Sequence, residues 1–210
     1  MMRKIVFGLV IIFSSFAAFT QEKADTLFFM NGEFLTAKVL DTANFEVHFN
    51  YMRKGKLKDL RVERERLFGI SYGNGDIRTY YYYDTLVGNY FTVDETHKFI
   101  YGEHDAIIGY KPWLDMAGGF LIGAASAIYT PTIIAPLPVF AFTACVTLIP
   151  NVRGNRKRIT NMNYITADSY LIGYERIARK KKSFYSLIGG VVGLAAGFGV
   201  QAIFFPGSIR

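Results

Sequence analysis

The sequence predicts an α+β protein: a small N-terminal antiparallel β module, barrel-like and of SH3-like size, followed by a helical, glycine-rich membrane domain. Short alternating runs separated by tight turns fill the first part of the chain, and long apolar segments fill the last hundred residues. In the last of these segments Gly189, Gly193 and Gly197 recur at every fourth position, which forms one smooth stripe on a helix. Such stripes let helices approach closely in lipid.

Composition and charge favour a membrane protein. The 210 residues are 51% hydrophobic and carry a net charge of +7. That charge is uneven, with −3 over residues 22–110 and +8 over residues 111–210. Basic residues that flank apolar segments are typical of topology signals and of contact with anionic lipid. We therefore expect membrane lipid, and not nucleic acid, as a partner.

Residues 1–20 have the organisation of a secretory signal peptide. Arg3 and Lys4 precede a short apolar core, and small residues lead to a plausible cleavage position after Ala18 or Thr20. An uncleaved N-terminal anchor is the alternative. In either case the segment that follows would be exported.

Residues 22–83 are predicted to form the β module. Phe45 to Tyr51 alternates apolar and polar side chains, as a half-buried strand does. Asn31-Gly32 is a strong hairpin signal, and Gly73-Asn74-Gly75 marks a second turn. Five or six short strands of this kind are expected to form a small barrel. The tyrosines at 80–83 provide either a partner-binding surface or sheet packing.

Residues 84–112 are predicted to form a connector and an amphipathic helix, with helical apolar spacing from Thr96 to Tyr110 and a weak point at Gly102. Residues 113–149 are predicted to form a pair of hydrophobic helices. The first helix of the pair carries a second stripe of small residues, namely Gly119, Gly123 and Ala127. This stripe is a candidate for packing against the C-terminal glycine stripe, and association with another chain is the alternative.

Residues 150–183 are predicted to form a basic segment with an amphipathic helix, and residues 184–205 a glycine-zipper membrane helix. Five basic residues precede that membrane helix: Arg176, Arg179, Lys180, Lys181 and Lys182. They are expected to contact lipid headgroups or to determine topology.

If residues 113–149 cross the membrane twice, the positive charge of residues 150–183 lies on the exported side, against the positive-inside rule. A single, broken crossing would place it in the cytoplasm. Length favours two crossings and charge favours one.

Two groups of residues resemble motifs in uncharacterised exported membrane proteins of Bacteroidota. The first group covers roughly residues 25–76 and consists of Asp25-Thr26, Asn31-Gly32, Lys38-Val39, Val47 to Tyr51, Phe68 to Tyr72 and Asn74-Gly75. The second group consists of Tyr101 to Ala106, Tyr110-Lys111, Tyr170, Gly173-Tyr174, Ala178 and Lys180 to Lys182. The resemblance implies an envelope protein and carries no catalytic residues.

The weak candidate polar cluster of the chain is Glu103, His104 and Asp105. With His97 these side chains are of metal-ligand type, but the two histidines lie two helical turns apart and no second His or Cys cluster exists in the sequence. We therefore expect surface or capping contacts here, and no metal or cofactor. Phosphate-loop, nucleophile-elbow and zinc-protease motifs are also missing, so no catalytic residue is assigned.

These patterns predict a non-enzymatic membrane protein of the cell envelope, with a structural, scaffold or partner-binding role. The expected location is the inner membrane, with the β module in the periplasm. The partner would be an envelope protein or a second copy of the chain.

Two alternatives remain open from the sequence. A small transporter or channel component would need a water-lined path built from Asp115, Thr143, Thr147 and Gln201. An envelope enzyme acting on lipid or peptidoglycan would need Glu103, His104 and Asp105 to line one cleft with a further polar group.

Overall fold

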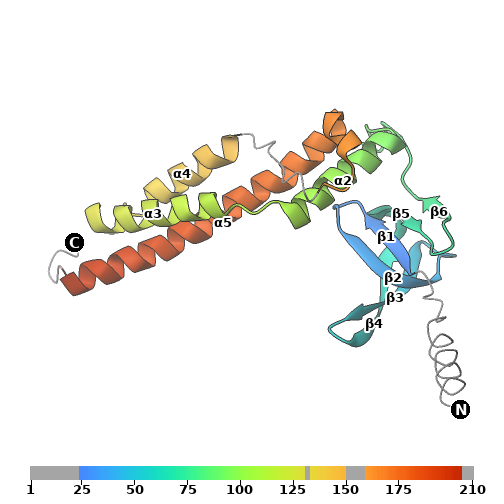
Figure 1. Ribbon diagram of the computed structural model, residues 1–210, viewed down its shortest axis with the longest axis horizontal. Helices are drawn as coiled ribbons and strands as arrows, with labels where there is room; N and C mark the ends of the chain where they lie inside the picture. Colours follow the sequence, from blue (N-terminus) through green and yellow to red (C-terminus); the bar gives the residue numbers. More distant parts are fainter. Residues whose placement is uncertain (1–23, 131–132, 150–158, 205–210) are drawn as a thin grey trace, which may run out of the picture.

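The computed structural model describes residues 24–130, 133–149 and 159–204. The described chain forms a six-stranded antiparallel sheet followed by α-helices. Figure 1 shows the sheet beside one end of the long helix α5 (Asp168–Phe204), and shorter helices lying along the same helix. The predicted signal peptide at residues 1–20 lies outside the described residues.

The sheet is open at both edges. Its strands are β1 (Asp25–Phe29), β2 (Phe34–Asp41), β3 (Glu46–Arg53), β4 (Lys56–Glu63), β5 (Leu67–Ser71) and β6 (Ile77–Thr79). They lie in the order β4-β3-β2-β1-β5-β6, so the expected barrel is wrong. Closure would require β6 to pair with β4. With three residues β6 offers few ladder bonds, and nearly all of β4 is exposed.

The core of the sheet is small and lies on one face. Its buried members are Leu27, Ala37, Val47, Phe49, Leu67 and Ile70. Val47 and Phe49 are the inward members of the alternation predicted for residues 45–51, and both are fully buried. Phe45, which that alternation places on the same face, is 91% exposed because it precedes the paired part of β3.

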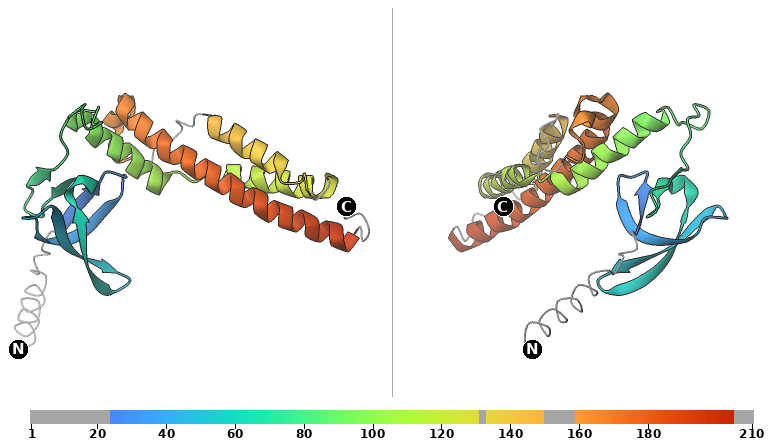
Figure 2. Two further views of the ribbon diagram at one scale, coloured as in Figure 1. Left: turned by 180° about the vertical axis from the view of Figure 1, so that it is seen from behind. Right: turned by 45° about the vertical axis from the view of Figure 1, so that its right-hand side comes forward.

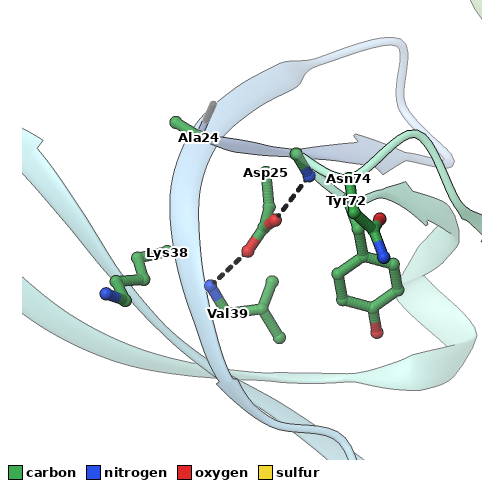
Figure 3. Close-up of a pocket in the computed structure, with 7 residues that line it drawn as sticks. Ala24, Asp25, Lys38, Val39, Tyr72 and Asn74 are labelled. Carbon is green, nitrogen blue, oxygen red and sulfur yellow. Dashed lines mark hydrogen bonds between the residues drawn. The ribbon is translucent and has the colours of Figure 1, made fainter. Parts of the chain in front are cut away.

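The Asp25 carboxylate ties β1 to two other parts of the sheet. Its oxygens accept hydrogen bonds from the backbone N–H groups of Val39 and Gly73, each over 2.9 Å. Figure 3 shows Asp25 pointing between β2 and the turn after β5. A carboxylate that accepts two backbone hydrogen bonds is well placed for a structural role.

Strands β3 and β4 are joined by the two-residue turn Lys54-Gly55. The φ angles are 51° at Lys54 and 75° at Gly55, as a type I′ turn requires. Lys54 is the one non-glycine residue with positive φ in the part of the chain that the structure describes. Asn is favoured at such a position, because its short polar side chain tolerates the left-handed conformation.

We expect Lys54→Asn to raise the free energy of unfolding by about 0.5–1 kcal/mol, because it removes part of the left-handed strain. Urea unfolding of the detergent-solubilised chain, followed by circular dichroism, measures the change. Lys56→Asn is the control, since Lys56 has an ordinary strand conformation and the same charge. Equal or lower stability of Lys54→Asn relative to the parent chain would contradict the prediction.

Helix α2 (Val93–Gly109) begins with a capping box. The Thr92 hydroxyl accepts a hydrogen bond from the Glu95 N–H, and the Glu95 carboxylate accepts one from the Thr92 N–H. The helix therefore starts before Thr96, where the apolar spacing placed its beginning. The predicted hydrophobic pair corresponds to α3 (Trp113–Tyr129) and α4 (Leu137–Leu148).

Helix α5 is continuous over 37 residues. The boundary expected after residue 183, between an amphipathic and a membrane helix, does not interrupt it. Residues 179–186 around this boundary contain one arginine, three lysines and no glycine or proline, so no residue there breaks the helix. α5 is long and apolar enough to span a membrane, whereas α3 and α4 are shorter apolar helices. Only 28% of the most apolar stretch of α5 is buried.

Candidate functional site

The three side chains of the predicted polar cluster point in different directions from α2. Glu103 pairs with Arg176 of α5, His104 contacts the sheet, and Asp105 binds Tyr170 at the start of α5. Glu103 and Asp105 are each 1% exposed, so the expectation of helix-surface contacts is wrong for both. The three side chains do not line one cleft. Their shared property is that each joins α2 to another element.

Asp105 fastens α2 to the start of α5. Its Oδ2 accepts hydrogen bonds from the Tyr170 hydroxyl (2.8 Å) and from the Thr160 N–H (3.0 Å), and its Oδ1 accepts one from the Thr160 hydroxyl (2.6 Å). A buried carboxylate is stable when several donors converge on it. Asp105 therefore holds the segment before α5 against α2.

Glu103 is only half satisfied. Arg176 donates to its Oε1 over 3.1 Å, while Oε2 is buried and has no hydrogen-bond partner among the described residues. Burial raises the pKa of the Glu103 carboxyl above its ordinary value, against the opposing effect of Arg176 and Lys180. Beside this pair lies a cleft of about 350 Å³, lined by Phe29, Met30, Asn31, Glu65, Arg66, Glu103, Arg176, Ile177 and Lys180.

We expect Glu103 to make the protein less stable as pH rises. Because its folded pKa is raised, its stabilising contribution is complete below the ordinary value of 4.5 and is lost as pH rises through the folded value. Glu103→Gln should remove this decline, which unfolding measured from about pH 4 to pH 8 would detect. Glu95→Gln is the control. The pKa of Glu95 is lowered by hydrogen bonds from Thr92, so its contribution is lost as pH falls instead. The same slope in the parent chain and Glu103→Gln would contradict the prediction.

His104 and the first hairpin turn dock the sheet on α2. The His104 ring stacks on Phe34 of β2 with ring centroids 3.8 Å apart, and its Nδ1 lies 3.1 Å from the Gly32 carbonyl oxygen. Gly32 has a φ of +76°, and a Cβ there would lie 2.4 Å from the Glu103 Cβ. The hairpin predicted at Asn31-Gly32 is thus also the contact with the helices.

The α2 and α5 backbones cross closely at two glycines. A Cβ added at Gly102 would lie 2.1 Å from the Tyr170 carbonyl oxygen, and one at Gly173 would lie 2.2 Å from the Phe99 carbonyl oxygen. Gly102 is therefore a packing residue, although its effect on helix propensity suggested a weak point. A single glycine on each helix gives no periodic signal, so the sequence does not predict this crossing.

Two lysines of the basic group bind helix C-termini. The Lys181 Nζ donates to the carbonyl oxygens of Ala106 (3.1 Å), Ile107 (2.5 Å) and Tyr110 (3.3 Å), which end α2. The Lys182 Nζ, in a side chain only 4% exposed, donates to the carbonyl oxygen of residue 149 after α4 (3.2 Å). A cation at a helix C-terminus donates hydrogen bonds to the unpaired carbonyl groups and interacts favourably with the helix dipole.

The other basic residues near Lys181 lie on the outer faces of α5. Arg176 pairs with Glu103 as described, and Arg179 pairs with Glu175 one turn earlier over 2.9 Å. Lys180 lines the cleft beside Glu103. The group expected to meet lipid headgroups or set topology therefore makes several contacts within the protein that sequence reasoning missed.

The two stripes of small residues lie in one interface between α3 and α5. A Cβ at Gly119 or Gly123 would lie 2.2 Å from a carbonyl oxygen of α5. The reciprocal distances from Gly189, Gly193 and Gly197 to carbonyl oxygens of α3 would be 2.0, 2.1 and 2.6 Å. Ala127 of α3 also faces the C-terminal glycine of the stripe. The structure thus brings together the six residues singled out for helix packing.

The polar side chains of the channel alternative do not converge. Ser186 of α5 donates to the Thr143 hydroxyl over 3.2 Å, and the Thr147 hydroxyl donates back to its own helix. Gln201 lies fifteen residues after Ser186, about 22 Å further along α5. Asp115 is at the start of α3 and accepts a hydrogen bond from a nearby tyrosine. These contacts are those of a packed bundle.

Comparisons of the chain with protein-family models, curated proteins and solved structures give no match.

Proposed function

We propose that this chain is a non-enzymatic membrane protein of the cell envelope that holds its β module at a fixed position relative to the membrane. The observation that carries the proposal is the bracing of one continuous helix, α5, by α2 at one end and by α3 and α4 at the other (Figure 1). A continuous helix transmits position between its ends, because it has no joint at which the module could swivel.

Membrane anchoring is supported by the outer faces of the apolar helices. Large apolar side chains are exposed there, including Leu121, Phe140, Val191, Val200 and Ile203. Exposed apolar surface on this scale is unfavourable in water and favourable in lipid. We place this part of the chain in the inner membrane with the β module in the periplasm.

A scaffold role is supported by how the polar groups are used. Asp105 and Glu103 brace α2 against α5, and Lys181 and Lys182 bind the ends of α2 and α4. These side chains are engaged in holding helices together. The same residue types in an active site would have to be free to contact a substrate.

A partner surface is supported by exposed apolar residues on the loop before α2. Leu86 is 97% exposed and Tyr90 is 73% exposed. Their neighbour Val87 is also exposed, in a turn closed by pairing between Asp84 and Asn89. Two exposed apolar side chains in this short turn and an exposed tyrosine directly after it favour a protein partner, either an envelope protein or a second copy of this chain.

Site-specific photo-crosslinking in native membranes tests the proposal. A crosslinking residue at position 86 should give one discrete adduct, whereas one at Glu63, which is exposed but polar, should give none. Two results would contradict the proposal. One is the absence of an adduct from the apolar turn. The other is turnover of envelope lipid or peptidoglycan by the purified chain that Glu103→Gln abolishes.

A further inference from the structure

The tip of the β3–β4 hairpin combines basic and apolar side chains. We call residues 51–58 the hairpin tip. It contains four basic residues and no acidic one, the basic residues being Arg53, Lys54, Lys56 and Lys58. Met52 and Leu57 are directly opposite each other on adjacent strands and are 68% and 67% exposed. A cationic surface with exposed apolar side chains is typical of protein segments that lie at a lipid interface.

The positive charge of the hairpin tip is not neutralised by an ion pair in the part of the chain that the structure describes. Its four basic side chains are exposed, and none makes an ion pair among the described residues. Asp59, the acidic residue directly after the hairpin tip, forms a hydrogen bond with the His48 ring. Lys54 keeps its charge at the turn in a backbone conformation that favours Asn or Gly. The tip therefore presents unpaired cations to its surroundings.

The hairpin is also directed toward the apolar helices. Figures 1 and 2 show it projecting away from the rest of the sheet, in the direction in which α5 runs from the sheet toward its C-terminus. α3 and α4 lie along that distal part of α5. A membrane around the apolar helices would thus lie on the side to which the hairpin points.

We propose that the hairpin tip binds the anionic lipid surface of the membrane in which α5 is anchored. The basic side chains would contact lipid phosphates, and Met52 and Leu57 would enter the headgroup region. This second contact would add to the bracing of α5 in holding the β module at a fixed position relative to the membrane. The inference rests on the proposed membrane anchoring, and it adds a lipid-binding site formed by the sheet.

The test uses the full chain with Cys145→Ser and Met52→Cys, labelled with an environment-sensitive dye at position 52. The protein is reconstituted in phosphatidylcholine vesicles with and without phosphatidylglycerol. We expect a blue shift and quenching by lipid-borne quenchers only with the anionic lipid. Removal of one positive charge should lower the ratio of lipid-bound to free hairpin tips about fivefold. Lys54→Asn measures this effect, because asparagine does not destabilise the turn. Arg61→Glu, nearer the base of the hairpin, is the control and should have a smaller effect than Lys54→Glu.

Trp113, the one tryptophan of the chain, separates the two proposals. It begins α3 and is 67% exposed, so membrane anchoring predicts its quenching in both kinds of vesicle. Failure of that quenching contradicts the anchoring itself. If Trp113 is quenched but the dye at position 52 stays in water, the hairpin inference is overturned and the anchoring is not. Protection of position 52 in native membranes but not in anionic vesicles would also overturn it, in favour of an acidic protein partner.

Discussion

Gly193→Leu is expected to separate α3 from α5 and to lower the free energy of unfolding of the helical part by about 3 kcal/mol. A Cβ at Gly193 would lie 2.1 Å from the Phe120 carbonyl oxygen and 2.9 Å from its carbonyl carbon and Cα. These are backbone atoms of α3, so no side chain can rotate to relieve the overlap. The helices must move apart, which also weakens the neighbouring contacts of Gly119 and Gly189.

Gly199→Leu is a closely matched control. It makes the same substitution on the same helix, but a Cβ at Gly199 meets no atom within 4 Å. Both substitutions raise helix propensity by about 1 kcal/mol, so that effect cancels in the comparison. SDS titration of the detergent-solubilised chain, followed by circular dichroism, measures the difference. Equal midpoints for the two variants would show that the α3–α5 contact contributes little to stability.

The α3–α5 interface illustrates what the sequence can predict. Glycines at every fourth position report directly on one helix face, because the spacing and the helical period nearly coincide. Two such stripes in one chain therefore suggested each other as packing partners, with association between chains as the alternative. The choice between intramolecular packing and self-association depends on the path of the chain between the stripes, which residue spacing does not encode.

The bracing contacts of α2 could not be predicted in the same way. Gly102 and Gly173 are single small residues, and each alone indicates only reduced helix propensity. Lys181 and Lys182 bind carbonyl groups that belong to helix ends far away in the chain. Every helix has unpaired carbonyls at its C-terminus, so the sequence gives no sign of which lysine will reach which end.

The sheet shows a different limit. The alternation and turn signals predicted its strands, since both are local properties. Whether the sheet closes depends on pairing between its first and last members in space. Here the candidate edge strands are the highly exposed β4 and the three-residue β6, which do not pair. Strand count and turn spacing are nearly the same for an open sheet and a small barrel.

Asp105→Ala is expected to lower the free energy of unfolding by about 4 kcal/mol, through loss of the contact between α2 and the start of α5. Hydrogen bonds to a charged group contribute about 1.5–3 kcal/mol each, and donors left unpaired in a buried site cost about 1–3 kcal/mol. Asp105 accepts three such bonds, from Thr160 and Tyr170. The Tyr170 side chain is 2% exposed, so its hydroxyl cannot readily turn to water.

Asp94→Ala on the same helix is the control for Asp105→Ala. Its carboxylate is 71% exposed and pairs with Lys98 one turn later, a contact expected to contribute about 0.3–0.5 kcal/mol. Urea unfolding gives the stability of both variants, and hydrogen exchange locates the change. If Asp105 braces the two helices, exchange should rise in α2 and at the start of α5 while the sheet stays protected. An increase in exchange limited to Thr160 would instead mean that Asp105 only orders the segment before α5. In that case the close crossing at Gly102 and Gly173 would be enough to hold α2 against α5.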